Sequence, residues 1–237
     1  MENQNNRFSS RLTFLLSALG IAVGTGNIWR FPRIVASNAG DDGAGAFLVA
    51  WITFLFLWSI PLIIVEYIMG RQSRMGTVGA FSNFMGKPFA FLGGFVGVVS
   101  TAIAFFYSVI VGWNIYYFGA IIFTDLPQNN DASWALWSSF QNSSFPIIFH
   151  AIAMTVGGLA IYKGVSSIEK VNKILIPVLL GIVLLSLFRA VSLPGSFDGI
   201  AYLFTPDWSQ LRRPGIWVDA LAQNAFDTGA GFGLFLT

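Results

Sequence analysis

The sequence predicts an all-α protein that crosses a membrane several times. Of its 237 residues, 55% are hydrophobic and only 10% are charged, and the mean hydropathy is +0.68. A soluble domain carries about 25% charged residues, so a chain this poor in charge is expected to lie mostly in lipid. Long uncharged runs point the same way, because a transmembrane helix needs about 20 apolar residues.

These runs predict five complete spans and the start of a sixth. No Asp, Glu, Lys or Arg occurs in residues 12–29, 43–65, 88–124, 143–162 and 174–188. With their flanks, the runs predict a single membrane domain, residues 1–237, with a cytoplasmic N-terminus at 1–11, a first span at 12–37 broken near 22–26, further spans at 43–70, 88–124, 143–162 and 168–191, an extracellular loop at 192–214 and a truncated sixth span at 215–237.

Charges in the connections predict the orientation of the spans. Basic residues precede the first span and follow the second and the fourth, whereas acidic residues follow the first and the third. Because Lys and Arg gather in cytoplasmic connections, we expect a plasma-membrane protein with its N-terminus in the cytoplasm. A cleaved signal peptide is the alternative interpretation of the first apolar run, but the run continues to Trp29 without a clear cleavage site.

Composition excludes several classes of function. The absence of cysteine excludes disulfides, thiolate metal sites and cysteine nucleophiles. With one histidine, His150, and isolated acids, no nucleophile–base pair or metal cluster suggests an intramembrane enzyme. A net charge of +2, without basic runs interleaved with aromatics, gives no reason to expect a nucleic-acid partner.

Residues 20–33, GIAVGTGNIWRFPR, place three glycines inside the first span. Each glycine costs about 1 kcal/mol in a helix interior, and unpaired backbone at membrane depth must line a cavity. If the helix unwinds between Ala22 and Gly26, its carbonyls become ligands for a hard cation such as Na⁺. The outer half-helix then presents the positive end of its dipole to an anion.

Close helix packing is the alternative interpretation of these glycines. Gly20 and Gly24 form a small-xxx-small pattern, which is typical of helix contacts in membranes. Asn27 and Arg30 favour a functional site, because polar and charged residues at membrane depth usually serve function.

A second candidate break lies at residues 224–233, NAFDTGAGFG, in the sixth span. It has three glycines in five residues, Gly229 to Gly233, beside Asp227. Glycine-interrupted helices in corresponding positions of two halves point to a transporter built from inverted repeats. Spans one and six are five apart, so the repeat unit is predicted to contain five helices.

These segments resemble the neurotransmitter:sodium symporter family, and the resemblance extends over essentially the whole chain. Its motifs are Ala22–Pro32, Gly45–Phe47, Pro61-Leu62 through Glu66 to Arg71, Tyr107 with Trp113, Gly164–Ser166 with Ile168–Lys170, Thr205–Trp208 and Pro214–Trp217. The family's bacterial members have broken helices, so the inverted-repeat argument is not independent of this resemblance. It implies the N-terminal half of a bacterial amino-acid-transporter-like member: the first five-helix repeat, and part of helix six, of a five-plus-five fold whose helices one and six are unwound mid-membrane.

The resemblance also implies a function and a set of site residues. The function is import of an amino acid coupled to Na⁺ by alternating access. Carbonyls of Gly20 and Val23 would belong to one sodium site, which is incomplete in this chain. The Ala22 carbonyl and the Asn27 side chain would belong to a second site, near Asp227, that touches the substrate. Substrate contacts would come from Ala22, Thr25, Gly26, Ile103, Tyr107, Phe226, Gly229 and Phe232. The Tyr107 hydroxyl would hold a substrate carboxylate, Arg30 would serve the outer gate, and Phe232 or Phe226 would form an aromatic lid.

Departures from the family pattern predict substrate class and ion dependence. Relatives that carry amines place an aspartate where this chain has Gly24, so Gly24 favours an amino acid that brings its own carboxylate. Asp227 stands where many members have a hydroxyl residue, and we hypothesise that it replaces the chloride of animal members. Trp51, where chloride-dependent members have tyrosine, agrees with this, and Gln223 is placed to hydrogen-bond Asp227. The alternative for Asp227 is a packing residue that is protonated in lipid.

Other features yield weaker expectations. Glu66 is expected either to bind backbone at the span-one break or to be solvated at the interface. His150 is expected to be a packed, hydrogen-bonded ring, with a proton relay as the alternative. The family's inner gate uses an arginine before an N-terminal aromatic, and Arg7 before Phe8 departs from that pattern. Since family members are about twice as long, we expect a fragment that is inactive alone. A non-transporting membrane scaffold or assembly subunit is the alternative function. The sequence predicts neither the oligomeric state nor which amino acid is carried.

Overall fold

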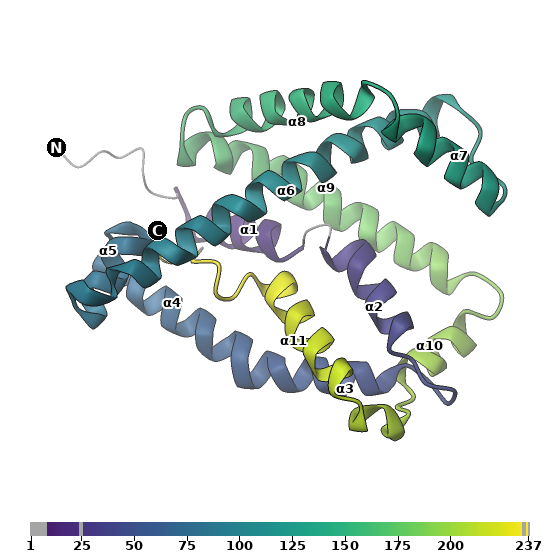
Figure 1. Ribbon diagram of the computed structural model, residues 1–237, viewed down its shortest axis with the longest axis horizontal. Coiled ribbons are helices and arrows are strands. Elements are labelled where there is room, and N and C mark those ends of the chain that lie inside the picture. The colour runs from purple at the N-terminus through teal and green to yellow at the C-terminus, as the bar shows by residue number, and fades with distance from the viewer. Residues whose placement is uncertain (1–8, 24–25, 234–235, 237) are drawn as a thin grey trace. The chain divides into compact units, whose positions relative to one another are not determined.

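The computed structural model describes residues 9–23, 26–233 and 236, and regular structure within them is entirely helical. The elements, labelled in Figure 1, are α1 (Arg11–Ala22), η2 (Gly26–Arg30), α2 (Phe31–Ser37), α3 (Gly45–Phe54), η3 (Leu55–Ser59), α4 (Ile60–Ser73), α5 (Gly76–Met85), η4 (Lys87–Phe89), α6 (Ala90–Phe123), α7 (Asn130–Gln141), α8 (Phe145–Ile161), α9 (Val165–Val191), α10 (Ser196–Phe204), η5 (Trp208–Arg212) and α11 (Pro214–Thr228). Two of the short elements, η2 and η3, are π-helical, and η4 and η5 are 3₁₀-helical.

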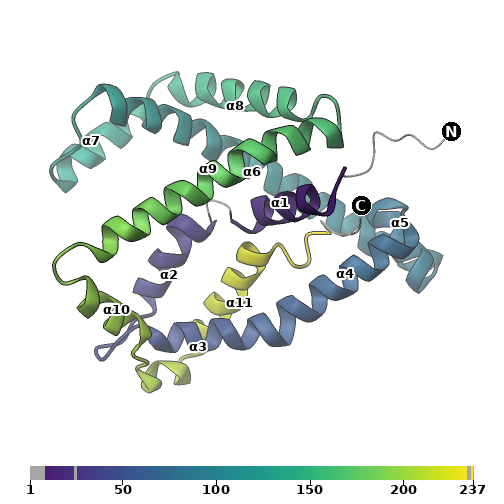
Figure 2. The same cartoon turned by 180° about the vertical axis from the view of Figure 1, so that it is seen from behind.

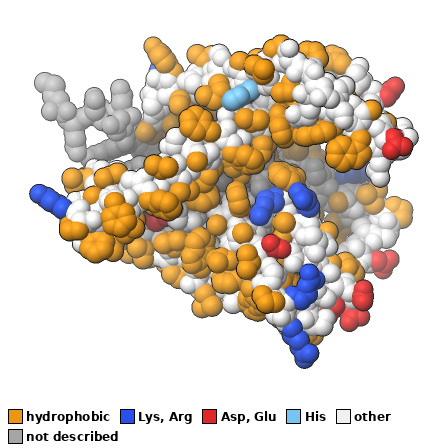
Figure 3. Space-filling model, viewed as in Figure 1, with side chains coloured by type: hydrophobic (Ala, Val, Ile, Leu, Met, Phe, Trp, Pro, Cys, Tyr) orange, Lys and Arg blue, Asp and Glu red, His pale blue; other side chains and the backbone are white. Residues whose placement is uncertain are grey.

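Among the described residues, three helical stretches are long and apolar enough to cross a membrane. They are Gly45–Ser73, Lys87–Phe123 and Val165–Val191, and α7 with α8 forms a fourth if this pair, bent by 72°, counts as one span. Hydrophobic side chains make up most of the face seen in Figure 3. Large apolar side chains such as Phe123, which is 85% exposed, are unfavourable in water. The exposed apolar surface therefore fits contact with lipid.

The described part of the chain divides into two compact units, residues 98–168 and residues 9–97 with 169–236. In the first unit, α6 and α8 approach closely at Gly112, which has no side chain. A Cβ at this position would lie 2.8 Å from the backbone nitrogen of His150. The His150 ring is 3.0 Å from the Ser108 hydroxyl, which agrees with a packed, hydrogen-bonded histidine. Tyr116 stacks on Phe140 at a ring distance of 4.2 Å. Aromatic packing thus holds α6, α7 and α8 together.

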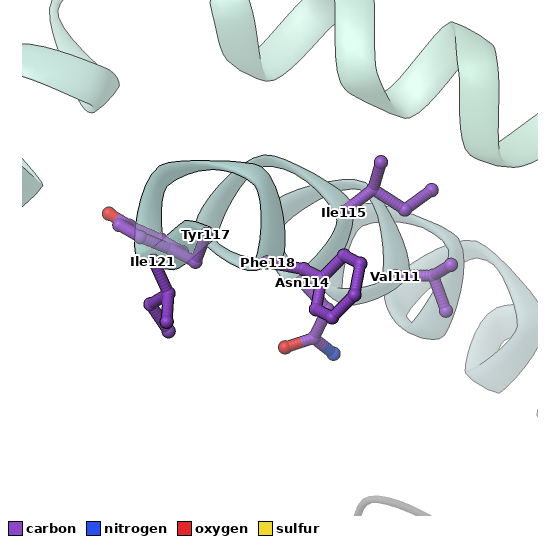
Figure 4. A pocket seen from close by; sticks show the side chains of 6 residues that line it. All are labelled: Val111, Asn114, Ile115, Tyr117, Phe118 and Ile121. Carbon is purple, nitrogen blue, oxygen red and sulfur yellow. The ribbon is translucent and has the colours of Figure 1, made fainter. Parts of the chain in front are cut away.

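An open hollow of about 540 Å³ lies along α6 in the same unit, and Figure 4 shows the side chains that line it. Its lining comes entirely from one helix: Val111, Asn114, Ile115, Tyr117, Phe118 and Ile121. A hollow lined by a single helix is a surface groove and brings no set of polar groups together.

The second unit has its core where α11 crosses α3, as Figures 1 and 2 both show. Ala46, Ala50 and Ala220 have no exposed surface, and such small residues let two helices approach closely. Phe47 is also fully buried and meets the ring of Phe31 edge-on at 5.9 Å. This packing fixes span two against span six, which is the part of the fold that positions the candidate site.

At the other end of this packing, residues 38–45 bind residues 202–207, a contact we call the loop clamp. The Ala44 N–H donates to the Tyr202 carbonyl at 3.0 Å, and the Gly45 N–H donates to the Thr205 carbonyl at 2.9 Å. A Cβ at Gly43 would lie 2.2 Å from the Thr205 carbonyl oxygen, so only glycine fits there. The clamp ties the connection between spans one and two to the segment after span five.

Helix α1 is held along α9 in the same unit. The buried Glu169 carboxylate accepts hydrogen bonds from the Ser9 N–H and hydroxyl and from the Thr13 hydroxyl. One turn further along, Asn172 donates to the Ser17 hydroxyl at 3.0 Å. These contacts place the start of span one against the start of span five.

Candidate functional site

The first span is interrupted where its glycines predicted a break. Helix α1 ends at Ala22, and the next residue, Val23, has φ −96° and ψ 66°, which is not helical. Element η2 begins at Gly26 and passes directly into α2. Gly24 and Thr25 lie outside the described residues, so the predicted substrate contact at Thr25 is not placed.

Gly20 has a packing role as well as a predicted ligand role. A Cβ at this position would lie 2.7 Å from the Cδ1 atom of Ile176 on α9. Close packing therefore explains the glycine at position 20, whereas the helix break explains the path of the chain after Ala22.

The sixth span is also interrupted, as predicted. Helix α11 ends at Thr228, and Gly229, Gly231 and Gly233 have φ values of 65°, 88° and 72°. Residues that carry a Cβ rarely adopt this left-handed backbone region, whereas glycine does so at little cost. The glycines are therefore required by the path of the backbone.

Glu66 on α4 holds the span-six break. Its Oε1 atom accepts a hydrogen bond from the Gly231 N–H at 2.8 Å and a longer one from the Gly233 N–H at 3.4 Å. The side chain is only 5% exposed, so the interpretation of Glu66 as a solvated interfacial residue is wrong. The structure shows backbone binding at the span-six break, whereas the binding expected at the span-one break concerns a segment whose Gly24 and Thr25 lie outside the described residues.

Asp227 is a buried carboxylate on the last turn of α11, immediately before the break. It is 6% exposed, and both of its oxygens accept hydrogen bonds. Gln223 donates to Oδ1 at 2.7 Å, as the sequence led us to expect, and the Trp51 indole N–H donates to Oδ2 at 2.9 Å. The role of Trp51 as a donor from span two was not anticipated.

Arg30 connects the half of span one after the break to this carboxylate through Gln223. Its guanidinium donates to the Gln223 Oε1 atom and lies 4.6 Å from the centre of the Phe226 ring. A cation at this distance from an aromatic ring is attracted by the ring's π electrons. Two of the residues predicted to serve gating, Arg30 and Phe226, are thus in contact.

Asn224, next to Gln223, is a buried polar residue that the sequence reasoning did not include in the site. Its side chain has no exposed surface and contacts the Trp51 carbonyl and the Ser59 hydroxyl. Two consecutive amides at membrane depth were a signal that could have identified it.

The structure brings some predicted site residues together and leaves others apart. Asn27 lies in η2, and Phe232 lies in the turn after Gly229. Ala22 is the last residue of α1, and Gly26 is the first residue of η2. Ile103 and Tyr107 lie on α6 in the other unit, so their relation to the broken helices is not placed. No three His, Asp or Glu side chains gather within the described ranges. A cation site there would draw mainly on carbonyl and amide oxygens.

Comparisons with known proteins agree with this architecture. A sequence model of the Sodium:neurotransmitter symporter family matches residues 5–145 and 142–237. An uncharacterised sodium-dependent transporter of Methanocaldococcus jannaschii is 32% identical, over 98% of this chain and 48% of its own length. The sodium-dependent neutral amino acid transporter B(0)AT2 of Pongo abelii is 30% identical, over 98% of this chain and 36% of its own length.

A solved structure is similar over the same extent. The crystal structure of the transporter MhsT in complex with L-phenylalanine matches with a TM-score of 0.82 and 34% identity, covering 98% of this chain and 53% of MhsT. The chain thus spans about half, or less, of the length of these relatives. Because the family match covers nearly all of the chain, the chain belongs to the sodium:neurotransmitter symporter family, whose members are sodium-coupled transporters and not enzymes.

Proposed function

We propose that the complete protein containing this chain is a symporter that imports a neutral amino acid together with Na⁺ across the plasma membrane by alternating access. The observation that carries the proposal is the buried hydrogen-bonded series from Arg30 through Gln223 to Asp227, which lies where spans one and six are broken. Charged residues at membrane depth are costly, and they usually mark ion or substrate pathways.

Sodium would bind to oxygens released by the two breaks. The carbonyls of Gly20 and Val23 would serve one site, and the Ala22 carbonyl with the Asn27 side chain would serve the other. Carbonyl oxygens suit hard cations. Residues outside this chain would complete the first site, so we expect the 237-residue chain to be inactive alone.

Asp227 would supply a fixed negative charge beside the second sodium site. Its two oxygens accept from an indole N–H and an amide N–H, which are the kinds of donor that a bound anion such as chloride would require. A carboxylate held by both donors leaves no need for chloride, so transport is expected to be chloride-independent.

The substrate class follows from Gly24 and from the relatives. Glycine at this position supplies no carboxylate to share with Na⁺, so the substrate would bring its own and place it near the Tyr107 hydroxyl. One relative is named as a neutral amino acid transporter, and MhsT was crystallised with L-phenylalanine. Both support a neutral amino acid, held under the Phe226 or Phe232 ring, with Arg30 closing the outer side.

The test is uptake by the complete protein in liposomes. Radiolabelled amino acids are offered with an inward gradient of Na⁺ or K⁺, and with chloride or gluconate as the anion. We expect uptake of at least one neutral amino acid that requires Na⁺ and is the same in both anions. Equal uptake in Na⁺ and K⁺, or no amino acid binding at all, would contradict symport and favour a scaffold. Chloride-dependent uptake would contradict the role of Asp227.

A further inference from the structure

Asn224 on α11 bridges two levels of span two with one carboxamide. Its Nδ2 donates to the Trp51 carbonyl at 2.7 Å and, more weakly, to the Ala220 carbonyl at 3.3 Å. Its Oδ1 accepts from the Ser59 hydroxyl at 2.9 Å. Asn224 and Ser59 have no exposed surface, so these bonds are made away from water, where a missing partner costs most.

The bridge closes over the π-helical turn of span two. Element η3, Leu55–Ser59, lies between α3 and α4, and the Ile60 N–H reaches the Leu55 carbonyl, five residues back. Pro61 follows and has no N–H to continue the helical pattern. Helix carbonyls point toward the C-terminus while side chains lean toward the N-terminus. The Trp51 carbonyl and the Ser59 side chain therefore point toward each other across the π turn, and the Asn224 carboxamide binds both.

Trp51 connects this bridge to the candidate site. Its carbonyl is held by Asn224 and its indole N–H is donated to Asp227. Asn224 and Asp227 are three residues apart on α11, so they lie on the same face of the helix. Helix α11 thus holds Trp51 at two points, its backbone and its ring.

From this geometry we propose that Asn224 is a positioning residue for sodium coupling: by fixing the backbone of Trp51 against the π turn, it aims the indole N–H at Asp227. This inference rests on the proposed function of Asp227. Without the carboxamide, the Trp51 carbonyl and the Ser59 hydroxyl lose a buried partner, and the ring loses its fixed backbone support. The Asp227 carboxylate then keeps one of its two donors, Gln223.

The first measurement is the Na⁺ concentration that gives half-maximal amino acid uptake by the complete protein in liposomes. Asn224→Leu keeps the number and branching of the side-chain heavy atoms but removes all three hydrogen bonds of the carboxamide, and it is expected to raise this concentration about tenfold. Trp51→Phe removes the indole N–H and is expected to raise it similarly. Asn38→Leu is the matched control, since Asn38 is another buried asparagine that binds α11, through Asp219, without contacting Trp51.

The double variant separates positioning from simple loss of packing. If Asn224 acts through the Trp51 indole, Asn224→Leu adds nothing to Trp51→Phe, because contacts in one series are not additive. Additive shifts in the two variants overturn the proposal. If Asn224→Leu does not fold, Ser59→Ala removes only the hydrogen bond to Asn224 Oδ1 and is expected to produce a smaller shift in the same direction.

A second readout does not depend on transport. The indole ¹⁵N–¹H resonance of Trp51, assigned by its loss in Trp51→Phe, is expected to shift and exchange faster with solvent in Asn224→Leu but not in Asn38→Leu. An unchanged resonance overturns the proposal whatever the sodium data show. If the wild-type protein shows no Na⁺ dependence, the proposed function fails, while this resonance still decides whether Asn224 positions the indole.

Discussion

The span-six break and the loop clamp both depend on glycine, but for different reasons. After α11, Gly229, Gly231 and Gly233 adopt positive φ, so the backbone path itself requires them. In the clamp, the described backbone of Gly43 is not left-handed, and glycine is needed because a Cβ would collide with the Thr205 carbonyl. One region needs conformational freedom, and the other needs space.

The two regions also satisfy their backbone polar groups differently. In the clamp, N–H groups of Ala44 and Gly45 pair with carbonyls of Tyr202 and Thr205. At the break, the N–H groups of Gly231 and Gly233 depend on the Glu66 carboxylate. Hydrogen bonds between two backbone groups persist when a side chain is substituted, whereas those to the Glu66 carboxylate are lost when this residue is replaced. We therefore expect substitutions at the break to change transport, and substitutions in the clamp to change stability.

The largest effect is expected for Glu66→Leu, which removes the acceptor for the break. Each buried N–H left without a partner costs about 1–3 kcal/mol. The backbone of residues 229–233 should therefore leave its present conformation, and uptake should be abolished. Glu66→Gln keeps one carbonyl oxygen and should retain part of the activity. Uptake in liposomes, with size-exclusion chromatography to check folding, makes the measurement. Near-normal uptake by Glu66→Leu would show that the carboxylate is not needed at the break.

A large but ion-specific effect is expected at Asp227. Asp227→Asn removes the negative charge and keeps the shape, so the Na⁺ concentration for half-maximal uptake should rise about tenfold or more. Asp227→Ser makes room for an anion beside Trp51 and Gln223, and its uptake should become stimulated by chloride. The comparison is uptake in chloride and in gluconate over a range of Na⁺ concentrations.

The control is Asp219→Ser. Asp219 lies on the same helix as Asp227, but its carboxylate accepts a hydrogen bond from Asn38 rather than from Trp51. It should show neither the sodium shift nor chloride stimulation. If Asp227→Asn kept the wild-type Na⁺ dependence, Asp227 would be a packing residue, which is the alternative that the sequence left open.

Local patterns were sufficient to predict both breaks and the Gln223–Asp227 bond. Clustered glycines mark a helix break by composition, and Gln223 and Asp227 are four residues apart on one helix, where side chains meet. Membership of the symporter family was likewise predictable from motifs spread along the chain, and the family match confirms it.

Contacts between helices could not be predicted in the same way. Trp51 meets Asp227 because α3 packs against α11, and the two residues are 176 positions apart in the chain. The π turn at Leu55–Ser59 follows Trp51, and apart from Pro61 the sequence carries no clear mark of it. The short helices α5, α7 and α10 were also missed, because they lie in connections that were read only as loops or flanks of spans.

A moderate loss of stability without a change in ion dependence is expected for Gly43→Ala in the clamp. The added Cβ would lie 2.2 Å from the Thr205 carbonyl oxygen, and overpacking of this kind costs about 1–3 kcal/mol. The melting temperature in detergent should fall, while the Na⁺ concentration for half-maximal uptake should stay unchanged. Gly199→Ala on α10 is the control, because a Cβ there meets nothing within 4 Å and should not lower the melting temperature. A sodium shift in Gly43→Ala would mean that the clamp and the break are coupled.

The smallest effect concerns the pH dependence of the clamp. Hydrogen bonds, above all from the Ser209 hydroxyl at 2.6 Å, lower the pKa of Asp207 below its ordinary value of 3.8. A carboxyl whose pKa is lower in the folded state stabilises the protein above the ordinary value, and this contribution is lost as the pH falls through the folded-state pKa. The melting temperature should therefore fall as the pH drops from about 5 through the ordinary value of 3.8 and below it.

Ser209→Ala removes the largest cause of the lowered pKa, so the pH dependence of the melting temperature should become shallower in this variant. The Ser209 N–H still donates to Asp207 at 3.0 Å, so part of the dependence should persist. Because the Asp207 carboxylate lies against Gly40, where a Cβ would come within 1.9 Å of its Oδ2 atom, protonation should loosen the clamp and leave the break intact. Sodium-dependent uptake after return to neutral pH should thus be unchanged in Ser209→Ala, and a lasting loss would show that the clamp does more than stabilise the fold.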